Sequence, residues 1–411
     1  MPAAEPAAAA RRPEGPGAAR MQPAVLAVAA ALIAALALRA GAEGGARLSL
    51  AVLIGAVAGL ALYHASFGFT AAWRRLARER RGAGLRAQLV LIGVASALSY
   101  PLMAWGEGAG VPMSGWILPM GVASALGAAM FGVGMQLGGG CASGTLYTAG
   151  GGSTRMLLTL LFFVLGSVLP TSHWDFWSAL PRTRSGVSLL AETGGPIPAL
   201  AVLFAALGAI GLASVALERR AHGTLEGPRR GGTWLQGPWS LLAGALALAA
   251  VCWATFLVLG RPWGITSALA LWGAKILAAA GAPVETWGYW SGWRAGQLER
   301  SVFADATSVM NFGIMAGALG AAGAAGRFAP LRRLGRRDVL TAVIGGLLMG
   351  YGARLAYGCN IGAYLGGLVS GSLHGAWWLL WGFLGSLAGT ALRSRLHMDS
   401  PLSPQPSGAA S

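Results

Sequence analysis

The sequence predicts an all-α polytopic membrane protein with about ten transmembrane helices, inverted internal repeats and Gly-rich broken or re-entrant segments. Composition is the first observation behind this prediction, because 55% of the 411 residues are hydrophobic, only 11% are charged, and the mean hydropathy is +0.60. A soluble protein of this length needs far more charge to cover its surface. The second observation is that apolar runs long enough to cross a bilayer alternate with arginine clusters, as membrane spans require.

Ten apolar runs qualify as predicted spans. Several are rich in Ala and Gly, which is typical of helices that pack closely through small residues in a membrane. A further run over 264–280 is apolar but short, and it predicts a half-helix or a re-entrant segment. The ten spans are 23–40, 48–70, 87–104, 118–138, 156–171, 198–217, 236–259, 304–326, 338–357 and 373–392.

The distribution of charge argues against a nucleic-acid partner, although the formal net charge is +16. The arginines form clusters in short loops between spans, where the positive-inside rule places them on the cytoplasmic side. All five clusters fall on one side of the predicted bilayer, so both termini are expected to be cytoplasmic. The clusters comprise Arg11, Arg12 and Arg20; Arg74, Arg75, Arg78, Arg80, Arg81 and Arg86; Arg219, Arg220, Arg229 and Arg230; Arg327, Arg332, Arg333, Arg336 and Arg337; and Arg393 and Arg395. The opposite loops carry the tryptophans of an aromatic belt, namely Trp105, Trp116, Trp174, Trp177, Trp287, Trp290 and Trp293.

The spans and the arginine clusters divide the chain into five parts. Residues 1–22, rich in Ala, Pro and Arg, are expected to be a disordered N-terminal segment. Ala-x-Ala-like spacing near residue 40 leaves a cleaved signal peptide as the alternative to a first membrane helix. The remaining parts are a first membrane repeat half over 23–217, a basic cytoplasmic linker over 218–235, a second repeat half over 236–392 and a C-terminal tail over 393–411.

Two short segments repeat each other, and each carries one of the three cysteines. Residues 136–144 read QLGGGCASG and residues 354–362 read RLAYGCNIG, so both contain Leu-x-x-Gly-Cys-x-x-Gly. Farther along, 161–167 (LFFVLGS) matches 380–386 (LWGFLGS) at nearly the same spacing. Doubled, Gly-interrupted apolar segments in a membrane protein point to a substrate site between two repeats of a transporter.

The predicted topology inverts one repeat relative to the other. The span before Cys141 runs from outside to inside, and the span before Cys359 runs the opposite way. A second pair, FGFT at 67–70 and WGIT at 263–266, behaves likewise. The two halves are therefore expected to be related by a pseudo-two-fold axis in the membrane plane. A parallel repeat is the alternative if one span has been missed.

Cys141 and Cys359 are the first candidate site residues. Thiols that face a narrow pathway offer weak S–H donors and polarizable sulfur, which suit a soft, sulfur-bearing anion. An isolated cysteine in a membrane helix is usually only a small hydrophobe, but recurrence in one Gly-Cys-x-x-Gly frame favours a function. Cys252 lies in an ordinary apolar span without a counterpart, and we interpret it as packing. The motif glycines allow both thiols to lie toward the middle of the bilayer, whereas a simple count places Cys141 nearer the inner face and Cys359 nearer the outer.

Backbone and side-chain donors surround the two motifs. Glycines at 138–140, 144 and 150–152 leave amides free of side chains, and a broken helix presents its N–H groups and positive dipole end to an anion. Gly140 and Gly358, which precede the two cysteines, are candidate pathway residues. The polar residues beside the breaks are candidate donors to oxyanion oxygens, with hydrogen bonds back to the helix as the alternative. They are Thr70, Ser143, Thr145, Thr266, Ser267 and Asn360.

Arg354 lies about one turn before Cys359, at the position that Gln136 occupies in the other repeat. An arginine this deep in a span is costly and pairs with another group or faces water. It either attracts an anion or neutralises a carboxylate such as Asp305, while Lys275 and Asp305 themselves are interpreted as structural or snorkelling. The histidines show no metal-ligand spacing and no nucleotide motif is present, so neither a metal nor a cofactor is expected.

At these residues the chain resembles the YeeE/YedE family of sulfur-compound transporters. The resemblance rests on GGCASG at 139–144, GARLAYGC at 352–359 and FGFT at 67–70, and it spans residues 50–390. It implies an hourglass-shaped helical protein of the inner (plasma) membrane that takes up thiosulfate, with the ion relayed past cysteine thiols by S–H hydrogen bonds. It also implies a small cytoplasmic sulfurtransferase-like partner. Cys141 and Cys359 match the family motifs.

The chain departs from the family at one pathway position. Members carry a third cysteine in a segment like SGFCFT, and Gly68 occupies that position here, within 66–70. The leading hypothesis is a transporter, not an enzyme, for thiosulfate or a related sulfur anion. The alternative is a membrane thiol oxidoreductase or sulfur-transfer enzyme with Cys141 and Cys359 as a redox pair, which would need their Cα atoms within roughly 7 Å.

Overall fold

Helices carry the fold of the part of the chain that the structure describes. The structure is a computed structural model and describes residues 20–110, 113–227, 232–330 and 333–398. Within these ranges three isolated β-bridges are the only strand-like pairing, and the all-α prediction is confirmed. Most of the predicted disordered segment and tail (1–19 and 399–411), together with Arg229, Arg230 and Arg332, lie outside the described residues.

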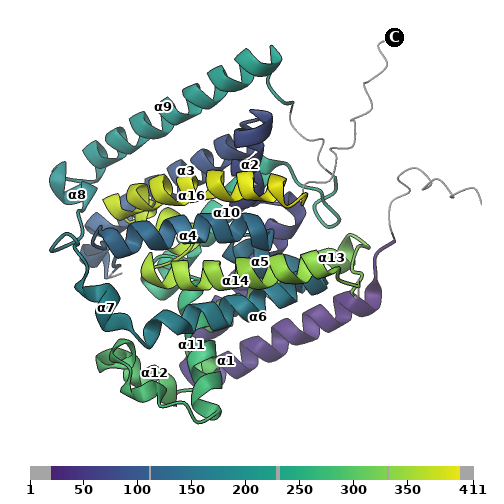
Figure 1. Ribbon diagram of the computed structural model, residues 1–411, viewed down its shortest axis with the longest axis vertical. Coiled ribbons are helices and arrows are strands. Elements are labelled where there is room, and N and C mark those ends of the chain that lie inside the picture. The colour runs from purple at the N-terminus through teal and green to yellow at the C-terminus, as the bar shows by residue number, and fades with distance from the viewer. Residues whose placement is uncertain (1–19, 111–112, 228–231, 331–332, 399–411) are drawn as a thin grey trace, which may run out of the picture.

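The ten predicted spans all coincide with helices (Figure 1). The long helices are α1 (Pro23–Ala65), α3 (Ala83–Trp105), α4 (Val122–Gly138), α6 (Thr154–Val168), α9 (Pro196–His222), α10 (Leu241–Leu259), α13 (Ala306–Ala324), α14 (Arg336–Leu355) and α16 (Leu373–Arg395). The shorter ones are α2 (Phe69–Glu79), α5 (Ala142–Gly150), α7 (Trp174–Ala179), α8 (Leu189–Glu192), α11 (Thr266–Ala279), α12 (Ala295–Glu299), α15 (Gly366–Val369) and a π-helix, η7 (Asn360–Leu365). The first two predicted spans share α1, which kinks where Gly44 and Gly45 leave helical geometry.

Seven stretches of the described chain are long and apolar enough to cross a membrane. The first runs through α1 and α2 and so contains two of the predicted spans. The spans predicted over 304–326 and 373–392 form α13 and α16, which are helices but are not among the seven. The short apolar helix predicted over 264–280 is α11. The chain is a polytopic helical membrane protein.

The prediction of one continuous span over 48–70 is wrong at its end. Helix α1 stops at Ala65 because Ser66 adopts left-handed backbone angles, with φ of 46°. Gly68 is extended, and α2 begins at Phe69. The segment 66–68 is therefore a break between two helices. The similar segment in the second repeat, 263–266, also follows a break and leads into α11.

Helices α4 and α14, which precede the two motif cysteines, pack against each other through glycines. A Cβ atom built on Gly127 would lie 2.7 Å from the carbonyl oxygen of Gly352, and one built on Gly345 would lie 2.9 Å from that of Gly134. Residue numbers that rise along α4 meet numbers that fall along α14, so the two helices are antiparallel. Equivalent helices of the two repeats thus run in opposite directions, which is the relation that an inverted repeat predicts.

The second repeated motif has the same packing role in both halves. Helix α4 packs on α16, and its counterpart α14 packs on α6. A Cβ atom on Gly385 of α16 would lie 2.0 Å from the carbonyl oxygen of Ala129, and one on Gly166 of α6 would lie 2.5 Å from that of Leu347. The glycine of Leu-Gly-Ser, at 165–167 and at 384–386, therefore lets the backbones of two helices touch, as small residues do at membrane helix interfaces.

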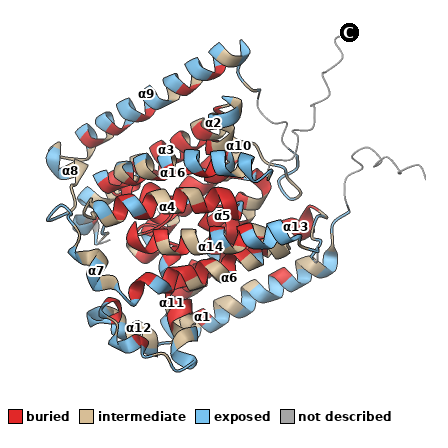
Figure 2. Cartoon of the chain, in the orientation of Figure 1, coloured by how far each residue is buried: buried red, intermediate tan, exposed pale blue. Residues whose placement is uncertain are grey.

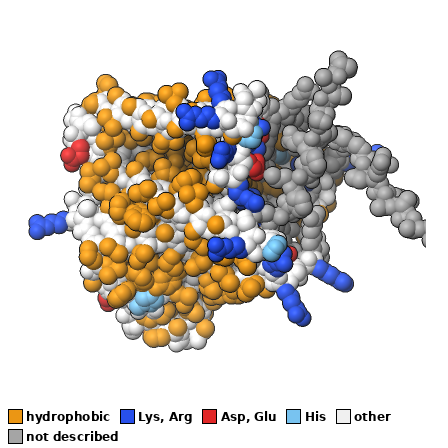
Figure 3. All heavy atoms as spheres, turned by 45° about the horizontal axis from the view of Figure 1, so that its top comes forward, with side chains coloured by type: hydrophobic (Ala, Val, Ile, Leu, Met, Phe, Trp, Pro, Cys, Tyr) orange, Lys and Arg blue, Asp and Glu red, His pale blue; other side chains and the backbone are white. Residues whose placement is uncertain are grey.

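The two ends of the bundle differ in the helices and loops they gather. In Figure 1 the start of α1 and the ends of α9, α13 and α16 lie at one end, while α7, α8 and α12 lie at the other. Arginines at 20, 219, 220, 327, 393 and 395 flank the helix ends of the first group. Buried residues concentrate on the central helices in Figure 2, and the face in Figure 3 is mostly hydrophobic, with most of its Lys and Arg toward the right of the view. The side of the membrane on which each end lies stays a prediction.

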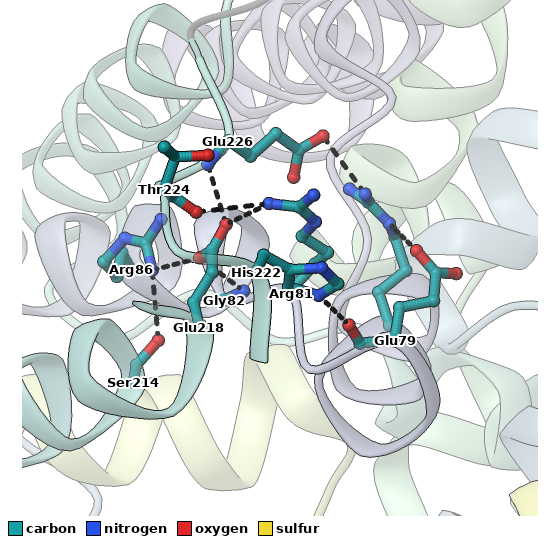
Figure 4. A network of polar contacts seen from close by, with 10 residues as sticks. Glu79, Arg81, Gly82, Arg86, Ser214, Glu218, His222, Thr224 and Glu226 are labelled. Carbon is teal, nitrogen blue, oxygen red and sulfur yellow. Dashed lines mark hydrogen bonds and ion pairs between the residues drawn. The ribbon is translucent and has the colours of Figure 1, made fainter. Parts of the chain in front are cut away.

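A fully buried carboxylate attaches the peripheral helix α9 to the turn between α2 and α3. Glu218 accepts hydrogen bonds from the guanidinium groups of Arg86 (2.7 Å) and Arg81 (3.2 Å). It also accepts from the backbone N–H groups of Gly82 (3.0 Å) and Glu226 (2.8 Å), as Figure 4 shows. Two cations and two amides compensate its charge, which a buried carboxylate requires. Through this contact α9 is tied to the start of α3 and to the turn after α2.

Candidate functional site

Both motif cysteines lie directly before the start of a helix. Cys141 is the extended residue before α5, and Cys359 is the extended residue before η7. Two residues earlier, Gly139 and Tyr357 both have positive φ, of 90° and 62°, so the chain turns in the same way in each repeat. Because the first N–H groups of a helix lack intrahelical partners, both thiols are placed beside backbone donors and the positive end of a helix dipole.

The fold buries the two thiols and brings the helices that follow them into contact. Cys141 is 1% exposed and Cys359 is 0% exposed. Helix α5 contacts η7, and both cysteines belong to the same buried hydrophobic core. The depth of the two thiols in the membrane stays a prediction. Both are free thiols, as is Cys252, which is buried in α10.

Different groups lie near the two thiols. The sulfur of Cys141 lies 3.4 Å from the hydroxyl oxygen of Ser143. The first backbone N–H groups of η7, which include those of Ile361 and Gly362, follow Cys359 directly. Thr145 donates to the carbonyl oxygen of Cys141 (2.9 Å), which is the bond back to the helix that the sequence left as an alternative. Donors therefore lie within one turn of each helix start.

The 67–70 segment adjoins both cysteine motifs. The side-chain amide of Gln136, on α4, donates to the carbonyl oxygen of Thr70 (3.1 Å). The ring of Phe69 contacts the ring of Tyr364 on η7, with 5.8 Å between centroids. Residues that flank the two cysteine segments thus contact 67–70, although 66 residues separate Gln136 from Thr70 in sequence.

Gly68 and its counterpart Gly264 have different surroundings. A Cβ atom on Gly68 would meet nothing within 4 Å, and Gly68 lines a pocket of about 40 Å³. A Cβ atom on Gly264 would lie 2.9 Å from the ring of Trp116, which also lies against Gly362. Sequence reasoning assigned Trp116 only to the aromatic belt and therefore missed its position over the break before α11. Thr266, the first residue of that helix, is buried.

Buried polar groups without partners lie on the same segments as the thiols. Neither side-chain polar atom of Asn360 has a hydrogen-bond partner among the described residues, and the residue is 0% exposed. The hydroxyl groups of Thr70 and Tyr364 are likewise buried and unpartnered in this part of the chain. Since buried polar groups are normally paired, these groups are available to the oxygens of a bound anion. Tyr364 was missed because its position in the other repeat, residue 146, is a leucine.

Arg354 does not pair with Asp305, so that predicted alternative is wrong. Asp305 instead accepts from the backbone N–H and the hydroxyl of Ser308, both at 2.7 Å, and caps α13. Arg354 donates to the hydroxyl of Tyr289. Lys275 donates to the carbonyl oxygens of Leu298 (2.5 Å) and Arg300 (2.6 Å), which is a structural role.

Comparison with known proteins extends beyond the motif segments. Residues 64–388 match the family model for sulphur transport. A thiosulfate transporter, TsuA, of Escherichia coli is 28% identical over 332 residues, which is 76% of this chain and 84% of the relative. TsuA of Spirochaeta thermophila is 31% identical over 268 residues, covering 60% and 70%. A probable transporter of Escherichia coli, YedE, is 32% identical over 144 residues, and the match spans only 35% of its length.

Proposed function

Because the chain belongs to the sulphur transport family, we propose that it takes up thiosulfate or a related sulfur-containing anion past the thiols of Cys141 and Cys359. The observation that carries this proposal is that two equivalent thiols are buried inside the bundle, each directly before a helix start, and that these two helices contact each other. Relatives named as thiosulfate transporters support the choice of substrate.

The passage needs only hydrogen bonds. Each S–H group donates weakly to the anion, and the polarizable sulfur matches the terminal sulfur of thiosulfate. The N–H groups at the starts of α5 and η7 stabilise a negative charge, and the side-chain amide of Asn360 can donate to the oxygens of the anion. Because no donor is a full charge, the anion is not trapped between the two thiols, and passing from one to the other requires no covalent step.

The same proposal includes the surroundings of the protein. We place it in the inner membrane with both termini in the cytoplasm, which the gathering of arginine-flanked helix ends at one end of the bundle supports. Anions delivered to that side would pass to a small cytoplasmic sulfurtransferase-like protein, the partner suggested by the sequence resemblance.

Uptake of labelled thiosulfate into proteoliposomes that contain the purified protein tests the proposal. We expect saturable uptake that unlabelled thiosulfate competes away at lower concentration than sulfate or sulfite does, because only thiosulfate offers a soft terminal sulfur. Uptake no greater than that of protein-free liposomes would contradict the transport function. Equal competition by sulfate would contradict the role of the thiols in selecting the substrate.

A further inference from the structure

Arg354 is a buried cation without a carboxylate partner in the described chain. It is 6% exposed, it forms no ion pair, and its only hydrogen bond among the described residues goes to Tyr289. Its Nε–H group is buried without any acceptor. Burying a charge without compensation costs several kcal/mol, so a group that the chain itself does not supply is expected to accept from this guanidinium.

Two arginines from α6 and α16 lie at the end of α4, the equivalent of α14 in the other repeat, and they have a different role from Arg354. Arg155 donates to the carbonyl oxygens of Leu137 and Gly138, both at 2.9 Å, and Arg393 donates to that of Gln136 (2.8 Å). These guanidinium groups cap the carbonyls that the last turn of α4 leaves free. Arg354 lies in the last turn of α14 and donates to no carbonyl in the described residues. Helix capping therefore does not account for its charge.

A second cation lies against the same tyrosine. The guanidinium of Arg294 is 4.4 Å from the centroid of the Tyr289 ring, and that of Arg354 is 5.3 Å from it. The carboxylate of Asp175 lies beside Gly288, which precedes Tyr289, but it is exposed and forms no ion pair with either arginine in the described chain. Two like charges that share one ring are mutually repulsive, and an anion between them would remove this repulsion.

A small recess lies beside the residues that follow Arg354 in sequence, although neither of the two arginines nor Tyr289 lines it. Its lining includes Leu355, which follows Arg354, and Tyr357, which lies two residues before Cys359. Trp174 also lines it and packs edge-on against Tyr289, with 5.1 Å between ring centroids. The free volume of about 10 Å³ holds roughly one water molecule, so an anion enters only when these aromatic side chains move.

We propose that Arg354 and Arg294, on the ring of Tyr289, form an anion-binding site that precedes Cys359 on the pathway. The site takes a small oxyanion, because a guanidinium presents a planar fork of donors that fits two oxygens. Charge selects anions here, and the thiols select soft sulfur afterwards. The identity of the anion as thiosulfate rests on the proposed function, whereas the existence of the anion site does not.

Arg354→Gln tests the site by installing the residue that the other repeat has at this position. We expect the KM for thiosulfate uptake and the Kd measured by calorimetry on the detergent-solubilised protein to rise about tenfold, because a charge-assisted hydrogen bond is lost. The maximal uptake rate should change less than about twofold, since the thiols remain. Arg354→Lys keeps the charge but lacks the planar fork of donors, so its KM and Kd should lie between those of the wild type and those of Arg354→Gln. Arg294 is only half-buried, so Arg294→Gln is expected to fold and to raise KM about threefold, and it replaces Arg354→Gln if that protein does not insert.

Arg300→Gln is the matched control, because it removes an exposed arginine from the same connection without touching Tyr289. We expect its KM and Kd to stay at the wild-type values. An equal rise in KM and Kd in all three Gln variants would mean that general surface charge attracts the anion, and it would contradict the proposed anion site. Wild-type affinity in Arg354→Gln or in Arg294→Gln would also overturn it. If thiosulfate binds by calorimetry and this binding depends on Arg354, but no protein transports it, the anion site stands and the proposed function fails.

Discussion

Gly127 and Gly352 meet backbone to backbone where α4 crosses α14. A Cβ atom on the first would lie 2.7 Å from the carbonyl oxygen of the second, and a Cβ atom on the second would lie 2.4 Å from that of the first. This reciprocal contact holds together the two helices that end at the cysteine motifs. The placement of Cys141 relative to Cys359 therefore depends on two residues that have no side chain.

Alanine at either glycine should destabilise the protein. In Gly127→Ala and Gly352→Ala, the new methyl group must push two backbones apart, and overpacking of this kind costs about 1–3 kcal/mol. Thermal unfolding of the detergent-solubilised variants measures the loss. Gly208→Ala on α9 is the control, because a Cβ there meets nothing within 4 Å, and its Tm should match or exceed the wild-type value. Equal Tm values for all three variants would contradict the close crossing.

The three cysteines should separate into two classes. Cys141→Ala and Cys359→Ala are each expected to lose most thiosulfate uptake while the protein still inserts, because each removes one of the two S–H donors. Cys252→Ala should transport almost as well as wild type, since this thiol lies apart from both motifs in α10. Uptake in proteoliposomes at matched protein content measures this. Mild and equal losses in all three would mean that the cysteines only pack.

Gly68→Cys should insert a third thiol without strain. The position has room for a side chain and ordinary extended backbone angles, and the added S–H group lies at the segment that contacts both motifs. We expect thiosulfate uptake to rise, or preference to shift from harder oxyanions toward thiosulfate, in competition assays. Gly264→Cys is the matched control, and it should lower stability because its Cβ meets the ring of Trp116. Unchanged selectivity in a well-inserted Gly68→Cys protein would show that the position does not line the pathway.

Glu218→Gln should loosen α9. The substitution removes the buried charge that Arg81 and Arg86 share, and breaking such a pair costs about 3 kcal/mol. A lower Tm, with faster proteolysis of the connection after α9, would show the loss. Glu226→Gln removes a partly exposed carboxylate from the same network and should cost less than about 1 kcal/mol. Indistinguishable Tm values for Glu218→Gln and wild type would contradict the anchoring role.

Reporter fusions test the orientation in the membrane. A reporter joined after Arg337 should lie in the cytoplasm, and one joined near Trp177 should lie outside, because arginine-rich loops are retained on the inner side. Cytoplasmic enzyme activity at the first fusion and periplasmic activity at the second are the expected readings. Activity that places both on the same side would disagree with the assigned topology and remove the membrane argument for an inverted repeat.

The helices, the doubled motifs and the two candidate thiols can all be predicted from the sequence. Apolar runs in a bilayer must satisfy their own backbone groups, so hydropathy along the chain is enough to place them in helices. Repetition of Gly-Cys-x-x-Gly identified Cys141 and Cys359 without any knowledge of their neighbours. Hydropathy is a poorer guide to short breaks, as at 66–68, where one left-handed residue ends α1 earlier than hydropathy suggests.

The tertiary structure alone decided which side chains meet. Three contacts join segments that are far apart in the chain. Tyr289 accepts a hydrogen bond from Arg354, Tyr364 packs against Phe69, and Trp116 covers Gly264 but not Gly68. Their sequence positions carry no signal, because one of each pair lies outside the repeated motifs. The physical reason is that contacts between helices depend on how each helix is rotated and how closely it packs, and glycine-to-backbone contacts between distant segments set both.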